Sequence, residues 1–239
     1  MKRAERQRLK QNDLGALTHR VQALFTERKR EYMWLAVAAV VVGAAAIGYW
    51  AWHERQQQGA HSLLADAMVV QETRVGPPAA PGTAGQAFPT ERERAQAAVV
   101  KFKAAADAYP STDAGIFARY QEASTQMALG NPNEAVKAYQ LVIERAGSTL
   151  YGQTARLGLA EARARSGQFD QAITGYKELA QRKDGGLPID GILMQLGRAY
   201  RDAGRASDAK QTFNRLIEEF PDSPFSADAK RELDALKKA

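Results

Sequence analysis

Three stretches of the C-terminal half repeat one another at a spacing of 37 residues, and this spacing limits how the chain can fold. Gly130, Gly167 and Gly204 mark the register. Small residues lie seven positions before each glycine (Ala123, Ala160 and Gly197) and five positions after it (Ala135, Ala172 and Ala209). An aromatic residue lies nine positions after each glycine (Tyr139, Tyr176 and Phe213), and an aliphatic residue twelve positions after it (Val142, Leu179 and Leu216). Small residues let two helices approach closely, the glycine ends the first helix, and the ring fills the space between helices. The spacing therefore predicts stacked helix hairpins.

These positions resemble the tetratricopeptide repeat. The third stretch has the family's consensus spacing at Leu196, Gly197, Tyr200, Ala209, Phe213 and Pro221. The first two stretches depart from it, since Gln126 and Arg163 stand where the family usually has tyrosine and neither stretch ends in proline. The resemblance implies an all-α protein, an α-solenoid of helix hairpins, and the uncharged segment of residues 33–52 adds one transmembrane helix before it. We expect repeats at about 114–147, 151–184 and 188–221, and a C-terminal capping helix at 224–238, within a repeat domain of residues 90–239.

One uncharged segment separates a basic tail from the rest of the chain. Residues 33–52 read MWLAVAAVVVGAAAIGYWAW. As a helix these residues span about 30 Å, the thickness of the hydrocarbon core of a bilayer. All three tryptophans lie here, Trp34 at one end and Trp50 and Trp52 at the other, as in the aromatic belts of membrane interfaces. We expect a transmembrane helix; a cleaved signal peptide and a buried soluble helix are the alternatives.

Charge gives an expected orientation. Residues 1–32 carry nine Lys/Arg and four Asp/Glu, a net charge of +5, whereas residues 53–239 carry 24 and 23, a net charge of +1. Basic residues remain on the cytoplasmic side of a membrane. The tail, residues 1–32, is therefore predicted to be cytoplasmic and the repeats to lie across the membrane. The near-neutral larger part argues against nucleic acid as a partner.

The segment between the membrane helix and the repeats allows two interpretations. Residues 53–74 are expected to continue the membrane helix, and residues 75–89 form a loop rich in proline, glycine and alanine. Thr90 with Glu93 forms a capping box that begins the next helix. Residues 60–74 either pair with that helix as the first half of a split repeat, or serve as a linker to a domain that begins at Thr90.

The sequence contains no motif that would carry catalysis. The chain has no cysteine, and its three histidines, His19, His53 and His61, lie outside the repeats. No zinc-protease, nucleophile-elbow, phosphate-loop or dinucleotide motif is present. We therefore expect no enzyme activity, no catalytic or metal-binding residues and no cofactor.

In the tetratricopeptide family the first helix of each repeat lines a groove. Carried over by position, this resemblance implies a peptide-binding surface with apolar and charged members. The Lys/Asn carboxylate clamp of the chaperone-tail binders is absent, since Tyr120 with Ser124, Leu157 with Glu161 and Met194 with Arg198 hold its places. Packing between repeats is the alternative role for these side chains. The candidate groove residues are Phe117, Tyr120, Met127, Leu157, Glu161, Met194, Arg198 and Arg201.

The order of tail, span and repeats resembles the ancillary subunit of the bacterial SecYEG translocon (the YfgM-type family), whose repeats are shared with CpoB-like proteins. Membership would imply a single-pass protein of the bacterial inner membrane with a periplasmic repeat domain. The expected partners would be other proteins: the translocon, a membrane-anchored periplasmic chaperone and emerging secreted chains. The expected function is a chaperone-like accessory of secretion. The alternative is a scaffold that tethers envelope-assembly or cell-division machinery without binding unfolded clients.

Overall fold

The computed structural model describes residues 29–76, 87–182 and 186–238, and they are almost entirely helical. The predicted cytoplasmic tail, apart from its last residues, and most of the predicted loop lie outside these ranges. Within them the only β pairing is a single bridge between Val75 and Phe88. The helices are α2 (Lys29–Glu72), α3 (Glu91–Ala108), α4 (Asp113–Ala128), α5 (Pro132–Ala146), α6 (Leu150–Arg165), α7 (Phe169–Gln181), α8 (Ile189–Asp202), α9 (Ala206–Glu219) and α10 (Ser226–Lys238). The expected all-α solenoid is confirmed.

The chain divides into two compact units after Arg55. In the first unit, the N-terminal part of α2 exposes its apolar side chains, among them Trp34, Val40 and Trp50. Among the described helices, α2 is the one long and apolar enough to cross a membrane, and none of its most apolar 18-residue window is buried. A core helix of a soluble protein would bury such a face, so this part of α2 is not a core helix in the structure described.

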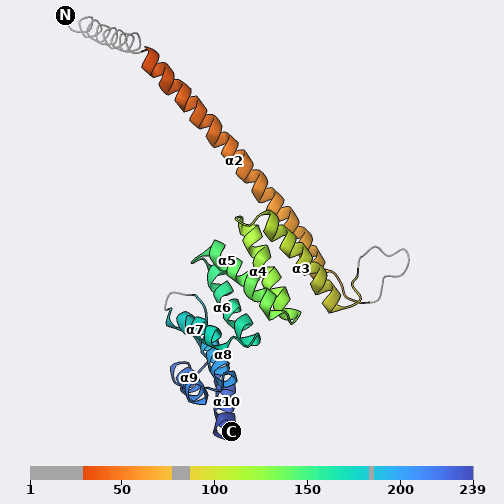
Figure 1. The fold of residues 1–239 in the computed structure, drawn as a ribbon, viewed down its shortest axis with the longest axis vertical. Coiled ribbons are helices and arrows are strands. Elements are labelled where there is room, and N and C mark those ends of the chain that lie inside the picture. Colours follow the sequence, from red (N-terminus) through yellow and green to blue (C-terminus); the bar gives the residue numbers. More distant parts are fainter. Residues whose placement is uncertain (1–28, 77–86, 183–185, 239) are drawn as a thin grey trace, which may run out of the picture. The chain divides into compact units, whose positions relative to one another are not determined.

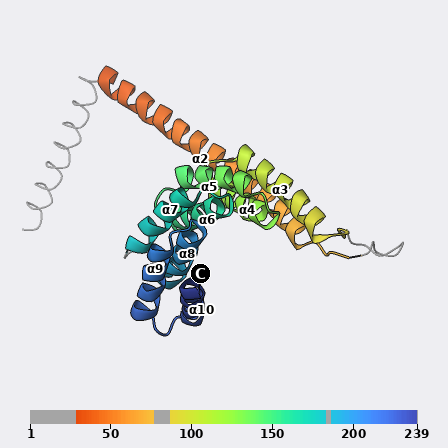
Figure 2. The ribbon, with the colours of Figure 1, turned by 60° about the horizontal axis from the view of Figure 1, so that its bottom comes forward.

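The second unit, from Gln56 onward, is a stack of antiparallel helix pairs, which Figures 1 and 2 show following one another in chain order from α3 to α10. The C-terminal part of α2 forms the first pair with α3. Ala67 of α2 and Phe102 of α3 are fully buried in one cluster, against which Leu63 and Leu64 pack. Residues 60–72 thus pair with the helix that Thr90 begins, and the Thr90 hydroxyl accepts a hydrogen bond from the Glu93 N–H at 3.2 Å.

The repeat positions have the roles that their residue types indicate. Gly130, Gly167 and Gly204 each have φ between 74° and 81°, the left-handed conformation in which glycine ends a helix. After the first of these glycines, the Asn131 N–H donates to the Gln126 carbonyl at 2.9 Å, which closes the end of α4. The alanines at the equivalent position of the second helices are fully buried: Ala135, Ala172 and Ala209.

Aromatic rings pack directly against glycines of neighbouring helices. A Cβ placed on Gly197 of α8 would lie 2.4 Å from the ring of Phe213 on α9, and one placed on Gly158 of α6 would lie 2.4 Å from the ring of Tyr139 on α5. Because carbon atoms in contact are about 3.5–4 Å apart, these positions admit only hydrogen. The ring of one helix therefore packs directly on the bare backbone of the next.

The core is continuous along the stack because α4 and α6 each contribute buried residues to two clusters. On α6, Ala155, Leu159 and Ala162 belong to the cluster with α4 and α5, and Ala160 belongs to the cluster with α7, α8 and α9. The C-terminal helix α10 closes the second of these through Ala229, Leu233 and Leu236. This is the nearest-neighbour packing of a solenoid with a terminal cap.

We predict that Gly197→Ala destabilises the repeat unit by about 1–3 kcal/mol, because the added methyl group would overlap the buried Phe213 ring. Gly191→Ala is the matched control on the same helix, since its Cβ would meet its nearest neighbour at an ordinary 3.4 Å. The control should be neutral, or more stable by about 0.5–1 kcal/mol, because alanine favours the helix. Urea unfolding of the full chain in non-ionic detergent, followed by circular dichroism, measures both. Equal stabilities of the two variants would contradict the close contact.

Candidate protein-binding surfaces

The first helices of the three repeats, α4, α6 and α8, hold the predicted groove residues. Threonine caps two of these helices: the Thr112 hydroxyl accepts from the Gly115 N–H at 3.1 Å, and the Thr149 hydroxyl from the Gly152 N–H at 3.4 Å. Each cap satisfies a backbone donor that the first helical turn leaves unpaired. Sequential packing places α4 beside α6 and α6 beside α8, so side chains at equivalent positions are neighbours along the stack.

Aromatic side chains of α4 remain partly exposed. The Phe117 ring lies 5.8 Å from the ring of Tyr151, which is on α6 and 43% exposed. Half-buried Tyr120 packs edge-on against buried Tyr139 of α5, with the ring centroids 5.8 Å apart. Beside Tyr151, Leu150 is 65% exposed. This aromatic surface, defined by Phe117, Tyr120, Leu150 and Tyr151, can contact an apolar segment of another protein.

The carboxylate of Glu161, on α6, lies near tyrosines of the neighbouring helices α4, α5 and α7. It accepts a hydrogen bond from Arg165 at 2.7 Å, one helical turn further on. Burial raises the pKa of Tyr120, and the negative charge of Glu161 raises it further. The same two causes raise the pKa values of Tyr139 and Tyr176. These phenols therefore remain neutral near neutral pH.

Both methionines predicted for the groove are buried. Met194 of α8 is 0% exposed and belongs to the cluster of the third repeat, against which half-buried Leu157 also packs. Met127 of α4 is 9% exposed and packs in the preceding cluster. In the row Tyr120, Leu157 and Met194, the first two side chains are half-buried and only Met194 is fully buried. This corrects the expectation of an open apolar strip at its methionine positions, because the neighbouring helices cover them.

The two arginines predicted for the groove have partners on the C-terminal helix. Arg201 donates to Glu232 of α10 at 2.5 Å, and Arg198 lies 3.6 Å from the same carboxylate. Asp228 of α10 lies 3.9 Å from Arg198. The pKa of Arg201 is raised, chiefly by its hydrogen bond to Glu232. The capping helix therefore engages the charged side chains of the third repeat.

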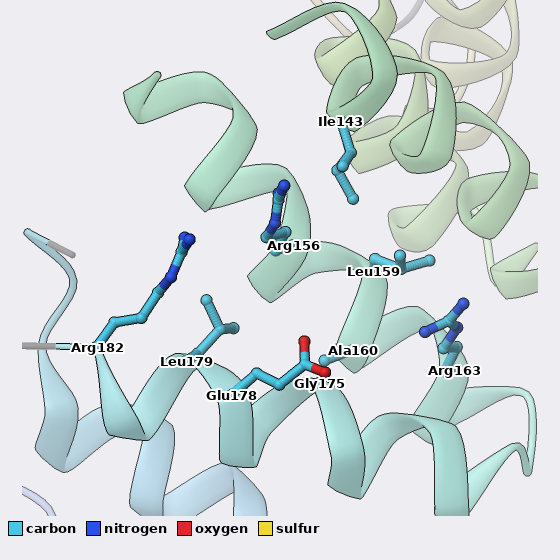
Figure 3. A pocket seen from close by; sticks show the side chains of 9 residues that line it. All are labelled: Ile143, Arg156, Leu159, Ala160, Arg163, Gly175, Glu178, Leu179 and Arg182. Atoms are coloured by element: carbon cyan, nitrogen blue, oxygen red, sulfur yellow. The ribbon is translucent and has the colours of Figure 1, made fainter. Parts of the chain in front are cut away.

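A cavity that the sequence reasoning missed lies between the second helices. Its volume is about 510 Å³, and it is lined by residues of α5, α6 and α7 and by Arg182 at the end of α7. Figure 3 shows its nine lining side chains, with the three arginines spread from one side to the other. The spacing of Arg156 and Arg163, seven residues apart on one helical face, was the available sequence signal. The lining residues are Ile143, Arg156, Leu159, Ala160, Arg163, Gly175, Glu178, Leu179 and Arg182.

Stacked helix pairs with partly exposed aromatic and basic surfaces define a helical-repeat scaffold. The tetratricopeptide repeat-like domain family matches residues 25–238, and the chain belongs to that family. The match includes the apolar part of α2 as well as the repeats. Proteins built on such repeats serve as protein-interaction scaffolds and are typically not catalytic. Within the described residues, no group of three or more His, Cys, Asp or Glu side chains is placed to hold a metal ion.

Solved structures show the same fold at low sequence identity. The chain is similar to nearly identical TPR-like repeats attributed to a kinesin light chain of Podosopora anserina, with 15% identity and a TM-score of 0.56 over 74% of this chain and 85% of that one. A single-substitution form of that protein gives 16% identity and a TM-score of 0.56 over 74% and 84%. No curated protein matches the sequence. These similarities support the repeat architecture alone.

We predict that Met194→Ala lowers the free energy of unfolding by about 2–5 kcal/mol, since the truncation leaves a cavity in the core of the third repeat. Leu150→Ala is the control, because Leu150 is 65% exposed and surface substitutions change stability by about 0.5 kcal/mol or less. Thermal or urea unfolding of the two variants distinguishes them. A Met194→Ala protein as stable as the unchanged chain would contradict the burial of Met194 in the core.

Proposed function

We propose that this protein is anchored in a membrane by residues 33–52 and uses its repeats to bind other proteins. The observation that carries the proposal is the exposure of the apolar side chains of α2 in a chain whose second unit has its own packed core. Twenty uncharged residues exposed to water would be costly, and a bilayer removes that cost. Trp34, Trp50 and Trp52 suit the two interfaces.

The proposed topology places the N-terminus in the cytoplasm of a bacterium and the repeats in the periplasm. The Lys/Arg excess of residues 1–32 favours this orientation over the reverse. A chain without cysteine is compatible with an oxidising compartment. The resemblance to the ancillary SecYEG subunit points to the same location, the inner membrane.

Within this setting we propose a chaperone-like accessory of the secretion translocon. The aromatic surface supports it: Phe117, Tyr120, Leu150 and Tyr151 offer apolar contacts that accept many sequences. On the same first helix as Tyr151, the charge of Glu161 acts on Tyr120, whereas half-buried Leu157 packs against the cluster of the third repeat. Emerging chains, the translocon and a membrane-anchored chaperone are the proposed partners. Contacts of this size give weak affinity, about micromolar or poorer.

The alternative is a scaffold that tethers envelope-assembly or division machinery and ignores unfolded chains. The network between α8 and α10 favours this reading of the third repeat, because Arg198 and Arg201 are held by Glu232 and are not free for a client. A scaffold of this kind would need a folded partner. Crosslinking in intact membranes, followed by identification of the partners, separates the two functions.

The topology prediction is that protease added to spheroplasts digests residues 53–239 and leaves the N-terminal tail protected. The Lys/Arg excess before the span is the physical reason. Immunoblotting with tags at both ends measures it, and lysed cells, in which both tags are lost, are the control. Digestion only after lysis would reverse the orientation. A mature N-terminus near Ile47 would identify a cleaved signal peptide.

The client-binding prediction is that Phe117→Ser with Tyr151→Ser reduces suppression of aggregation of a denatured test protein severalfold. The pair removes the two neighbouring rings of the aromatic surface. Val100→Ser with Leu141→Ser is the matched control, since these exposed apolar side chains lie on second helices. Light scattering measures aggregation, and circular dichroism checks that the helices remain. Equal suppression by both double variants, with folding intact, would exclude this surface as the client site.

A further inference from the structure

The cavity between α5, α6 and α7 contains buried guanidinium atoms without partners. Arg156 Nη1 and Arg163 Nε are both buried and make no hydrogen bond within the described residues. Both arginines belong to α6, and both line the cavity. A buried donor left unpaired costs about 1–3 kcal/mol, and more when it is charged. Both arginines therefore retain unused hydrogen-bonding capacity beside the cavity, which an oxygen ligand can satisfy.

The charge of the cavity favours an anion. Its lining carries three arginines and one carboxylate, a net charge of +2, since Glu178 is the one acidic residue among the nine. In Figure 3 Arg182 and Arg163 lie towards opposite sides of the opening, with Arg156 between them. The guanidinium group matches a carboxylate in a two-bonded, planar arrangement. The cavity is thus electrostatically complementary to acidic side chains.

The walls are apolar between the arginines. Leu159 and Ala160 of α6, Ile143 of α5 and Leu179 of α7 are its apolar lining residues. Such a surface retains a ligand that carries apolar groups beside its charges, and a small inorganic anion would leave it uncovered. Glu178 would also repel a multiply charged phosphate group more strongly than a single carboxylate.

The spacing of the arginines gives a length. Seven residues along an α-helix advance about 10 Å, so Arg156 and Arg163 lie about two helical turns apart on one face. A polyproline II segment has three residues per turn and a rise of about 3.1 Å per residue, so residues i and i+3 share one face about 9 Å apart. Acidic residues at positions i and i+3 of such a segment would reach the two arginines, with an apolar residue at i+1 on the adjacent face towards Leu159 and Leu179.

We propose that this cavity, on the second-helix side of the repeats, binds an acidic and apolar segment of a protein partner. It is a separate surface from the aromatic one on the first helices, and it does not depend on the membrane topology. The proposal rests on the protein-binding character of the repeats proposed above. Because the two surfaces are separate, they can hold two partners at once. Failure of either surface to bind leaves the other open to test.

The test measures binding of three labelled dodecapeptides, built from Glu-Leu-Ser, Gln-Leu-Ser or Lys-Leu-Ser repeats, to the full chain in non-ionic detergent. We expect the glutamate peptide to bind at least tenfold more tightly than the other two, with an affinity that falls as salt rises. Arg156→Gln with Arg163→Gln should weaken binding of the glutamate peptide by about tenfold or more. Arg215→Gln is the control: it removes a charge from α9, where Arg215 pairs with Glu219.

A second variant keeps the proposal falsifiable if the double variant unfolds. Glu178→Gln removes the exposed carboxylate of the cavity and should tighten binding of the glutamate peptide severalfold, with the helicity unchanged. No tightening would overturn the proposal, as would equal binding of the glutamine peptide or full binding by a folded double variant. Vesicles of phosphatidylglycerol provide the competing outcome. If they bind through Arg156 and Arg163 while the peptide does not, the site is a lipid site and the proposal is wrong.

Discussion

The close approach of a ring to a residue without a side chain is the contact on which the repeat unit depends. Phe213 covers Gly197 within one hairpin, and Tyr139 covers Gly158 across two successive repeats. Since interiors are packed at crystal-like density, each such contact fixes the distance and rotation of two helices. Contacts of this kind, repeated along the chain, generate the stack. The positions of α4, α6 and α8 in the stack then determine which of their side chains stay exposed.

The capping helix at the end of the solenoid occupies side chains of the third repeat that an inner repeat would leave available. The capping helix α10 buries Ala229 and packs Leu233 and Leu236 against the third repeat. It also brings Glu232 to Arg198 and Arg201. Charged side chains that would face a partner in an inner repeat are satisfied within the chain instead. Both proposed binding surfaces lie in the first two repeats.

The two candidate surfaces differ in chemistry because they lie on different sides of α6. Tyr151 lies on the side with α4, where its ring meets that of Phe117. Arg156 and Arg163 belong to the side with α5 and α7, where guanidinium groups line a cavity. One helix thus serves an apolar surface and a basic one, since side chains three or four positions apart share a face and those between them do not. A scaffold with this division can hold two chemically distinct partners.

The sequence by itself determined the helix hairpins, their register and the apolar helix, because glycine, small residues and rings at a fixed spacing leave few ways to pack. It also located the Thr90 cap, whose hydrogen bonds are local. The sequence did not determine which side chains of the first helices are exposed. Met194 and Leu157 occupy the same repeat position as Tyr120, yet Met194 is fully buried and the other two are half-exposed. Which side of a helix stays open depends on the next helix, including α10, and the cavity around Arg156 exists only where three helices meet. Those contacts join residues far apart in the chain, so only the tertiary structure decided them.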